Sequence, residues 1–511
     1  MLPYAIIVVF LILLWTIKWI KGAWKVHDGR PIPRHPGLPL IGSALELNDR
    51  NSNKKFEEMT ARYGEIFSLN MFGQNVVVLS SENMIRKAFC SEQYAKHLNN
   101  KPRSFFGTYF RNNCESLAFF ANATDPLYKR LKKVFMAALH SYGSGLQNIE
   151  NKVVEELENV REKIDSFKGK EFGFDVIIKQ SLTNIMSLVL IGEAFPDDEP
   201  EENLFWQKIA AITFFITPHT DSLLSLFPFL RFIPGLKFQK AFRFGKNVDK
   251  IIAERFFYST RNKPSIRHNK GIVDYYLAEQ TKQKLSGNEP FLTDERIKTQ
   301  LYETIDAGIV TSWSLLVNSM VVLLNHPEIQ TKVQEELDRV VGGNRSPTFS
   351  DRSNCHYFMA FEKEVHRLIT VAPRLVPHYC YDDIVFEGYF VPKGSMIVPN
   401  IWSVHHDEKL WGDPWIARPE RFLDEDGFLL PSEHIYCRSL MPFGLGDRRC
   451  SGETFAKTRY FLFLSTLLQR YTFKFAEGSI KRSCDPRNVD DFEVDIVFRA
   501  KSFSVQAVER V

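Results

Sequence analysis

A single cysteine, Cys450, lies in a glycine-rich and basic run near the C-terminus, Phe443-Gly444-Leu445-Gly446-Asp447-Arg448-Arg449-Cys450-Ser451-Gly452. Its glycines allow positive φ angles and a close approach of the backbone to a flat ligand. Phe443 is placed to cover the sulfur. Backbone N–H groups and the two arginines are expected to favour thiolate over thiol, because hydrogen bonds and opposite charge lower the pKa of a thiol. No second Cys or His stands at a zinc-binding spacing from Cys450. The run predicts a lone thiolate ligand for an iron already held by a macrocycle, and a structural cysteine in a glycine turn is the alternative.

The run resembles, at every fixed position, the haem-binding loop F-G-x-G-x-R-x-C-x-G of the cytochrome P-450 superfamily. The resemblance implies haem b (iron protoporphyrin IX) with Cys450 as the axial ligand, whose thiolate pushes electron density toward O–O cleavage. It also implies a mainly α fold with a small β part, in which the haem lies between a long central helix and the cysteine loop. Within this family, the sequence most resembles the microsomal group that includes the xenobiotic and steroid hydroxylases.

Two further motifs follow the order of this family. A helical-looking segment, Phe361–Ile369, contains Glu364-Val365-His366-Arg367, which is similar to E-x-x-R, and Pro419-Glu420-Arg421-Phe422 resembles P-E-R-F. A carboxylate and a guanidinium three residues apart on a helix can pair, although such a pattern alone is also typical of a solvated ion pair. The resemblance implies that Arg421 completes a buried, structural cluster with Glu364 and Arg367. We expect any substitution in the cluster to prevent haem incorporation.

A long helix is predicted from the capping pair Thr293-Asp294 to the stop signal Asn325-His326-Pro327. Apolar residues recur between them at helical spacing, over about thirty residues. Within this helix, Ala307-Gly308-Ile309-Val310-Thr311-Ser312 is similar to the family pattern A-G-x-(D/E)-T-(T/S). The resemblance implies that Gly308 leaves room for oxygen and substrate, and that Thr311 relays protons. A helix kink and a hydroxyl bonded back to its own helix are the alternatives.

Val310 departs from this pattern, because most members of the family carry an acid there. Asp306, four residues earlier and about 40° away around the helix, could partly substitute through water. Members that rearrange peroxides without taking electrons also depart from the acid–alcohol pair. Val310 therefore raises a reductase-independent peroxide or endoperoxide isomerase as an alternative function, against which Thr311 argues.

The residues expected to contact the haem propionates also depart from the family pattern. Where the family has W-x-x-x-R on a helix, Tyr128 and Lys132 take the places of the tryptophan and the arginine. Each keeps a hydrogen-bond donor, although lysine lacks the planar fork of arginine. Arg448 and His378 are further candidates for propionate binding. The altered contacts motivate a second alternative, a non-enzymatic haem sensor or carrier.

Composition favours one large catalytic domain over residues 46–511. The chain has 511 residues, of which 44% are hydrophobic and 25% charged, and no Gly/Ser-rich linker or repeat divides it after residue 50. Seven scattered cysteines, an odd number, favour a reducing compartment. The net charge of +4 is slight, and we expect no nucleic-acid partner.

Residues 1–22 are predicted to form a transmembrane anchor. Leu2–Ile17 is largely apolar, tryptophans lie near the end of the run, and lysines follow it. A cleaved signal peptide would need a basic start and a small-residue cleavage site, which the sequence lacks. A basic and proline-rich hinge follows over residues 23–45. We expect a single-pass anchor in the endoplasmic reticulum membrane, with the catalytic domain facing the cytosol.

Between the anchor and the haem motifs, Glu65–Asn70 and Asn75–Ser81 are predicted to be strands joined at Gly73-Gln74, and the remainder to be mainly helical. Phe205–Phe244 is rich in Phe and Leu and broken by prolines. It predicts two helices with a loop that dips into lipid, or else a buried helical pair. Contact with lipid would suit an apolar substrate such as a sterol or a fatty acid.

The resemblance also implies redox partners. The family takes electrons from NADPH–cytochrome P-450 reductase, an acidic flavoprotein, and cytochrome b5 is a further candidate. Basic residues gather beside the expected haem, at Lys129, Arg130, Lys132 and Lys133, with Arg448 and Arg449 in the cysteine loop. Complementary charge would steer the encounter with the reductase. The alternative is that this basic run is simply a solvated helix face.

Overall fold

The computed structural model describes residues 28–510, apart from 40, 49, 142–145, 195–200, 263–270, 288 and 495–496. The predicted anchor over residues 1–22 and the first part of the hinge lie outside the described residues.

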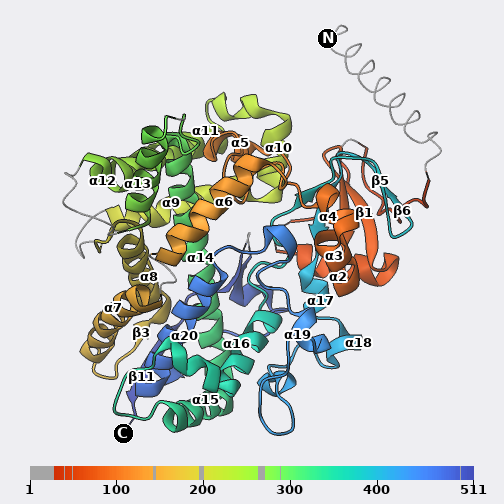
Figure 1. Cartoon of the computed structure of the whole chain (residues 1–511). Coiled ribbons are helices and arrows are strands. Elements are labelled where there is room, and N and C mark those ends of the chain that lie inside the picture. Colours follow the sequence, from red (N-terminus) through yellow and green to blue (C-terminus); the bar gives the residue numbers. More distant parts are fainter. Residues whose placement is uncertain are drawn as a thin grey trace.

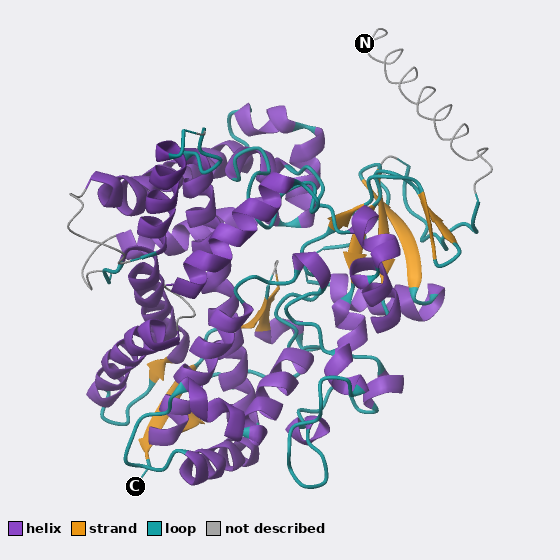
Figure 2. Cartoon of the chain, in the orientation of Figure 1, coloured by secondary structure: helices purple, strands orange, loops and turns teal. Residues whose placement is uncertain are grey.

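The fold is mainly helical with a small β part, which confirms the fold class predicted from the sequence (Figure 2). The helices fill one side of the molecule, and strands β1, β5 and β6 lie on the other, beside α2, α3 and α4 (Figure 1). The α-helices are α2 (Ser52–Tyr63), α3 (Glu82–Cys90), α4 (Glu92–Leu98), α5 (Phe105–Phe110), α6 (Pro126–Leu139), α7 (Leu146–Ser166), α8 (Phe174–Ile191), α9 (Glu201–Ile216), α10 (Pro218–Leu226), α11 (Lys237–Ile252), α12 (Ser259–Asn262), α13 (Ile272–Leu285), α14 (Asp294–Asn325), α15 (Pro327–Val340), α16 (His356–Leu368), α17 (Ile401–His405), α18 (Glu408–Trp411), α19 (Ile435–Ser439) and α20 (Glu453–Arg470).

Shorter helical turns complete the helical part. They are η2 (Pro228–Phe232), the π-helical η3 (Ala253–Tyr258), η4 (Phe349–Asn354), η5 (Pro419–Phe422), η6 (Gly446–Arg448) and η7 (Val489–Asp491). The last of these precedes the C-terminal strands. Two of them carry motifs found in the sequence, because η5 is the P-E-R-F segment and η6 lies inside the cysteine loop.

The strands form four small sheets in the described part of the chain. Their bounds are β1 (Ile66–Met71), β2 (Gln74–Leu79), β3 (Phe172–Gly173), β4 (His378–Tyr379), β5 (Ile384–Phe386), β6 (Tyr389–Val391), β7 (Met396–Pro399), β8 (Tyr471–Phe475), β9 (Phe492–Val494), β10 (Phe498–Ala500) and β11 (Ser504–Glu509). The four-stranded sheet has the order β1-β2-β7-β4, and the others pair β3-β11-β8, β5-β6 and β10-β9.

The predicted pair of strands exists, with its turn one residue earlier than expected. β1 and β2 pair antiparallel from Ile66↔Leu79 to Met71↔Gln74. The turn is Phe72-Gly73, with φ angles of 51° and 85°. Two consecutive positive φ angles are those of a type I′ turn, which matches the twist of the strands it joins.

The long helix predicted from the sequence is α14. Its N-cap is Thr293, whose side chain accepts a hydrogen bond from the N–H of Arg296, and the helix ends at Asn325 before Pro327. These are the start and stop signals that the sequence contains. The helix is 32 residues long, and most of its second half is buried on every side.

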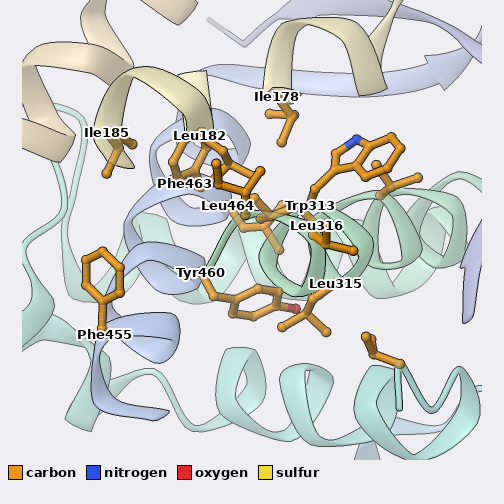
Figure 3. Packing of buried hydrophobic residues seen from close by; sticks show 14 of the residues in the cluster. Ile178, Leu182, Ile185, Trp313, Leu315, Leu316, Phe455, Tyr460, Phe463 and Leu464 are labelled. Carbon is orange, nitrogen blue, oxygen red and sulfur yellow. The ribbon is translucent and has the colours of Figure 1, made fainter. Parts of the chain in front are cut away.

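The main hydrophobic core joins α8, α14 and α20 around α14 (Figure 3). Among the described residues, α8 and α14 are long and apolar enough to cross a membrane, but 72% and 83% of their apolar windows are buried inside the protein. Core burial therefore accounts for their composition. The residues drawn in Figure 3 include Ile178, Leu182, Ile185, Trp313, Leu315, Leu316, Phe455, Tyr460, Phe463 and Leu464.

The Phe-rich segment 205–244 forms three helices and a helical turn instead of two helices. Prolines start α10 and η2, and Pro234 precedes α11, because a proline ring is tolerated at the first turn of a helix but not in its interior. Large apolar side chains at the joints between these elements are exposed: Leu226, Phe227, Phe229, Phe232, Ile233 and Leu236. We call this group the aromatic patch.

Candidate active site

One cavity of about 630 Å³ is bordered by the cysteine loop and by the middle of α14. This volume is in the range of small-molecule sites. Cys450 and Thr311 both line it, and each has surface that is accessible from this enclosed cavity, whereas α14 beyond Thr311 is mostly buried. The fold therefore brings together the two motifs that are about 140 residues apart in the sequence.

The cysteine loop is held by its own backbone. The N–H of Cys450 donates to the carbonyl of Phe443 at 2.8 Å, and α20 starts three residues after the cysteine. Gly446 has a φ of +65°, and a Cβ there would lie 2.1 Å from the carbonyl oxygen of Phe89. Only glycine fits this position, because the backbone conformation and the approach of α3 both exclude a side chain.

The surroundings of Cys450 do not lower its pKa, contrary to the expectation from the two arginines. Burial raises the pKa of the Cys450 thiol; the N–H of Gly452 and the charge of Arg449 lower it, while Glu453 raises it. Arg449 is bound through two hydrogen bonds, of 2.7 and 2.8 Å, to Glu453. Arg448 points to backbone carbonyls instead of to the sulfur. The protein alone thus favours the thiol.

Phe443 lies in the wall of the cavity that also contains Cys450, where it packs against His366 and Lys457. Its ring centroid lies 5.3 Å from that of His366, edge to face, and Lys457 Nζ lies 5.4 Å from it. The His366 ring is buried, and neither of its nitrogens has a hydrogen-bond partner among the described residues. Burial lowers the pKa of His366 to about 4. The His366 ring is therefore neutral where it packs on Phe443.

Glu364, Arg367 and Arg421 meet in one buried cluster. Arg367 donates to the two carboxylate oxygens of Glu364 at 2.8 and 2.7 Å, and Arg421 Nε lies 3.4 Å from Glu364 Oε1. All three side chains are at most 1% exposed. Other donors of the two guanidinium groups bind backbone carbonyls and Asp413, while Arg421 Nε has no hydrogen-bond partner among the described residues. A buried charge cluster is tolerated when its members are satisfied in this way.

His405 joins this cluster to the cysteine loop, and the sequence reasoning missed it. Its backbone carbonyl accepts from Arg367 Nη1 at 3.0 Å, and its Nε2 accepts from the N–H of Met441 at 3.1 Å. Thr370 lies 2.8 Å from its other ring nitrogen. Burial holds the pKa of His405 well below its usual range, so the ring is neutral and can accept. Nothing in the local sequence distinguishes His405 from the adjacent His406.

On α14, Thr311 is bonded back to its own helix. Its hydroxyl donates to the carbonyl of Ala307 at 2.6 Å. This is the usual bond of a threonine inside a helix. The hydroxyl oxygen nevertheless faces the cavity and keeps its lone pairs as acceptors.

The sequence predicted that Gly308 leaves room for oxygen and substrate. In the structure, the space beside its Cα is instead occupied by Met186 of α8. A Cβ at this position would lie 3.1 Å from Cε and 3.2 Å from Sδ of Met186. The missing side chain of Gly308 therefore allows α8 to pack closely on α14. The backbone of Gly308 still lines the cavity.

Val310 is 8% exposed and lines the cavity, so no acid stands at its position. Asp306 also lines the cavity, but it forms an ion pair with Arg111, which follows α5. The carboxylate is thus held toward α5. This arrangement differs from the free, water-linked acid that the sequence analysis considered.

A group of cationic or potentially cationic side chains lines another part of the cavity. Arg448 donates to the carbonyls of Asn99, Leu117 and Phe120, and Lys101 donates to the carbonyl of Val376 at 2.7 Å. Neither forms an ion pair with a described acidic residue. His378 is buried, and its Nδ1 has no partner in the described part of the chain. Burial, together with the positive charge of Arg448, holds the pKa values of Lys101 and His378 well below their usual ranges.

This group fits the carboxylates of a haem. Buried cations without acidic partners are costly, and an anion placed among them would offset that cost. Lys101 was missed by the sequence reasoning, because the run Asn99-Asn100-Lys101-Pro102 has no distinctive pattern. No cluster of three or more His, Cys, Asp or Glu suited to a metal occurs among the described residues.

Tyr128 and Lys132 bind the cysteine loop. The Tyr128 hydroxyl and Lys132 Nζ both donate to the carbonyl of Asp447, at 3.4 and 2.5 Å. Tyr128 also lies under the guanidinium of Arg448, 4.1 Å from the ring centroid, and lines the cavity. Lys132 does not line it and binds the loop instead, so propionate binding by Lys132 stays a prediction.

Arg459 of α20 is a further buried cation that the sequence reasoning missed. It donates to the carbonyl of Gly308 at 2.9 Å and to the hydroxyl of Ser312 at 2.8 Å. Burial lowers the pKa of Arg459 to about 9. The residue ties the helix that follows Cys450 to the turn of α14 that contains Thr311.

Comparison with protein families gives one match, to the family model described as Cytochrome P450, over residues 32–506. The match covers the cysteine loop, the E-x-x-R helix and α14 together. It therefore covers all the motifs that carried the resemblance in the sequence.

Individual relatives match along almost the whole chain. The steroid 17-alpha-hydroxylase/17,20 lyase of Gallus gallus is 30% identical over 517 residues, which cover 99% of this chain and 97% of the relative. The enzyme of the same name from Ictalurus punctatus is 29% identical, with 89% and 88% covered. Cytochrome P450 2D28 of Mesocricetus auratus is 26% identical, with 99% and 98% covered.

Proposed function

This chain belongs to the cytochrome P450 family, and we propose that it inserts one oxygen atom from O2 into an apolar small molecule, using electrons from NADPH delivered by a flavoprotein reductase. The family consists of haem-thiolate enzymes, and its cofactor is haem b with a cysteine thiolate ligand. The single observation that carries the proposal is that Cys450 and Thr311 line the same cavity from two different elements.

The residues present suit this cofactor. Cys450 would hold the iron, while Arg448, Lys101 and His378 would bind the propionates. Once bound, the haem supplies the activation of dioxygen. Metal coordination deprotonates a thiol outright, so the raised pKa of Cys450 in the protein alone does not oppose ligation.

Around the reacting centre, the chain supplies a proton path and a dry pocket. The Thr311 hydroxyl, bonded to the carbonyl of Ala307, can accept a proton from water and pass one on toward the centre of the cavity. Val310, Leu315 and Val371 contribute apolar walls, which exclude water and favour an apolar substrate.

We propose a sterol or steroid, a fatty acid or a xenobiotic as the class of substrate. The lining of the cavity is mostly apolar and aromatic. Two of the relatives are named for a steroid reaction, which makes a steroid the first substrate to test.

We also propose that the protein is anchored in the endoplasmic reticulum membrane with this domain in the cytosol. The apolar N-terminal run of the sequence supports an anchor. The exposed aromatic patch supports a second contact with lipid, because a group of large exposed apolar side chains is unusual on a soluble surface. All seven cysteines lie in the described part of the chain and each is free, as expected in a reducing compartment.

The proposed docking face for the reductase is the exposed side of α6 next to the cysteine loop. Lys129, Arg130 and Lys133 are exposed there, and the bond from Lys132 to Asp447 places this helix against the loop. Replacing Lys129 and Lys133 by Glu should weaken reductase binding, and the effect should shrink at high salt. Lys168→Glu, an exposed substitution after α7, is the control.

The test of the proposed function has two stages. First, the purified protein is reduced and treated with carbon monoxide, and we expect the Soret maximum of a cysteine-ligated haem, which Cys450→Ser should abolish. Second, NADPH, reductase and a panel of sterols and fatty acids are added, and oxygen consumption and product are measured.

Each alternative has a distinct outcome. Turnover of a peroxide or endoperoxide without NADPH and reductase would identify an isomerase. Haem binding without oxygen consumption in step with product, for any member of the panel, would favour a sensor or carrier. Product that forms only with reductase and NADPH supports the monooxygenase.

A further inference from the structure

An ion pair stands in the wall of the otherwise mainly apolar cavity, on the α14 side. Arg111 follows α5, and its guanidinium binds the carboxylate of Asp306 on α14. Both residues line the cavity. Their side chains are 2% and 15% exposed, so Asp306 is the member that presents polar surface to a ligand.

Stability alone gives a poor account of this pair. Arg111 also donates to the carbonyl of Phe110 at 2.7 Å and lies 4.5 Å from the centroid of the Phe106 ring, but its Nε has no partner among the described residues. A buried donor without a partner is costly, and a buried ion pair is weak evidence for stabilisation.

The segment after α5 is already fastened to the same helix by other contacts. Arg296 of α14 binds Glu115 at 2.9 and 3.2 Å, and Glu303 accepts from the N–H groups of Leu117 and Ala118 at 2.9 and 2.8 Å. The Arg296–Glu115 pair does not line the cavity. Glu303 also lines the cavity, but its carboxylate already accepts from these two N–H groups and from the Ser116 hydroxyl. Of the two ion pairs that join this segment to α14, the Arg111–Asp306 pair is the one that lines the cavity.

We propose that the Arg111–Asp306 pair is the polar recognition point of the substrate pocket, and that it selects an apolar substrate carrying a neutral hydroxyl group. This inference rests on the proposed function and names the substrate class more closely. The hydroxyl donates to the carboxylate of Asp306, which offers about four lone-pair sites and can accept it besides Arg111.

The charges of the two side chains determine which polar group of a ligand binds best at this pair. Because the carboxylate and the guanidinium neutralise each other, neither an ammonium nor a carboxylate ligand gains a free counter-charge there. A neutral hydroxyl gains a charge-assisted hydrogen bond without that requirement. A site built around such a bond discriminates strongly against an analogue that lacks the hydroxyl.

The position along α14 also constrains the substrate. Asp306 precedes Thr311 by five residues, which is about 7.5 Å along the helix axis at 1.5 Å per residue. A hydroxyl held at Asp306 therefore places a distant carbon of the same molecule beside Thr311. The substrate class is an extended apolar skeleton with a hydroxyl at one end.

The experiment is a spectral ligand titration of the haem-loaded protein with matched probes. One series is 1-dodecanol, dodecane and dodecanoic acid, and the other is 5α-androstan-3β-ol and 5α-androstane. We expect at least one of the alcohols to bind at least tenfold more tightly than its alkane, and dodecanoic acid to bind no more tightly than dodecanol.

The test variant replaces both members of the pair, Asp306→Leu with Arg111→Met, so that no buried charge is left alone. Replacing both partners of a buried pair by apolar side chains is often neutral for stability. The preference for the alcohol should fall to within about twofold, with alkane binding retained. The matched control is Glu115→Leu with Arg296→Met, which removes a tie between the same two elements outside the cavity and should keep the preference.

Several results would overturn the inference. These are equal binding of alcohol and alkane by the unaltered protein, tighter binding of the acid than of the alcohol, no binding of either alcohol, or an unchanged preference in the Asp306/Arg111 variant. Equal loss of preference in the control variant would also overturn it, because the pair would then act only through the fold.

Haem content and the reduced carbon monoxide spectrum are recorded for every sample. Loss of those signals in the unaltered protein would count against the proposed function itself, whereas a normal spectrum without alcohol preference would remove only this inference.

Discussion

Arg367 donates to the backbone carbonyl of His405 at 3.0 Å, and the His405 ring accepts from the N–H of Met441, nine residues before Cys450. The buried ionic cluster of Glu364, Arg367 and Arg421 is thereby connected to the segment that leads into the cysteine loop. A change in the cluster should disturb the loop even though no member of the cluster touches the sulfur.

Glu364→Gln tests this connection. Removing the shared carboxylate of this buried cluster leaves Arg367 without its counter-charge and Arg421 with Asp413 alone, and breaking a buried charge pair typically costs about 3–5 kcal/mol. We expect little or no haem-loaded protein, measured as the ratio of Soret to protein absorbance. The matched control is Glu158→Gln, in the exposed i,i+3 pair with Arg161, where the expected cost is about 0.5 kcal/mol or less. Normal haem content in Glu364→Gln would show that the cluster is dispensable.

Gly446→Ala tests the close approach of the cysteine loop to α3. A Cβ there would collide with the carbonyl of Phe89, and the backbone has a positive φ, so we expect a loss of about 2–4 kcal/mol and poor haem retention. Thermal unfolding and haem content are the measurements. Gly343→Ala is the control, because its φ is not positive and no atom lies within 4 Å of its Cβ position. Equal behaviour of the two variants would mean that the loop moves freely away from α3.

Lys101→Met should have opposite effects on the protein with and without haem. Without haem, the substitution removes a buried amino group whose one hydrogen bond within the described residues goes to a carbonyl and whose pKa burial holds well below its usual range. Its removal should stabilise the protein by about 1–3 kcal/mol. With haem, it removes a counter-charge to a propionate, and haem dissociation should be about tenfold faster, the equivalent of about 1.4 kcal/mol. Haem transfer to a scavenger protein and thermal unfolding measure the two effects. Lys170→Met, at an exposed position, should change neither. A destabilised haem-free Lys101→Met protein would contradict the assignment.

Thr311→Ala should uncouple oxygen consumption from product. If the Thr311 hydroxyl relays protons, its removal should lower product per oxygen consumed by about tenfold or more, whereas Thr311→Ser should retain coupling. Thr304→Ala is the matched control, since Thr304 also lines the cavity and donates to the carbonyl four residues earlier on α14, at 2.7 Å. Unchanged coupling in Thr311→Ala would show that Thr311 is not the relay.

Asp221→Asn should change the dependence of stability on pH. Asp221 accepts from the N–H of Phe106 at the start of α5, and burial raises its pKa to about 6. A raised carboxyl pKa means that the folded protein binds the proton more tightly than the unfolded chain. The contribution of Asp221 to stability is therefore fully present below the unfolded pKa of about 3.8 and is lost as the pH rises through about 6.

Thermal unfolding of the natural protein and of Asp221→Asn between about pH 5 and pH 7.5 checks this sign. The natural protein should lose stability relative to the variant as the pH rises, because only the natural protein carries the buried carboxylate. A constant difference across this range would contradict the raised pKa.

The sequence by itself determined the elements whose signals are local. The cap at Thr293 and the stop at Pro327 fixed both ends of α14, and the two short segments on either side of Gly73 were recognisable as β1 and β2 to within about two residues. Cys450 and the three members of the ionic cluster were recognisable because their motifs are short and contiguous. Such features depend on neighbours a few residues away, which a sequence displays directly.

Only the tertiary structure decided which long-range partners each side chain meets. It placed Met186 against Gly308, Arg111 on Asp306, and the carbonyl of Asp447 at the end of Lys132, and each contact changed an expected role. Lys101 and His405 became visible only by burial. The physical reason is that burial and pairing, which set the cost of a charge and the direction of a pKa, are properties of packed elements that lie far apart along the chain.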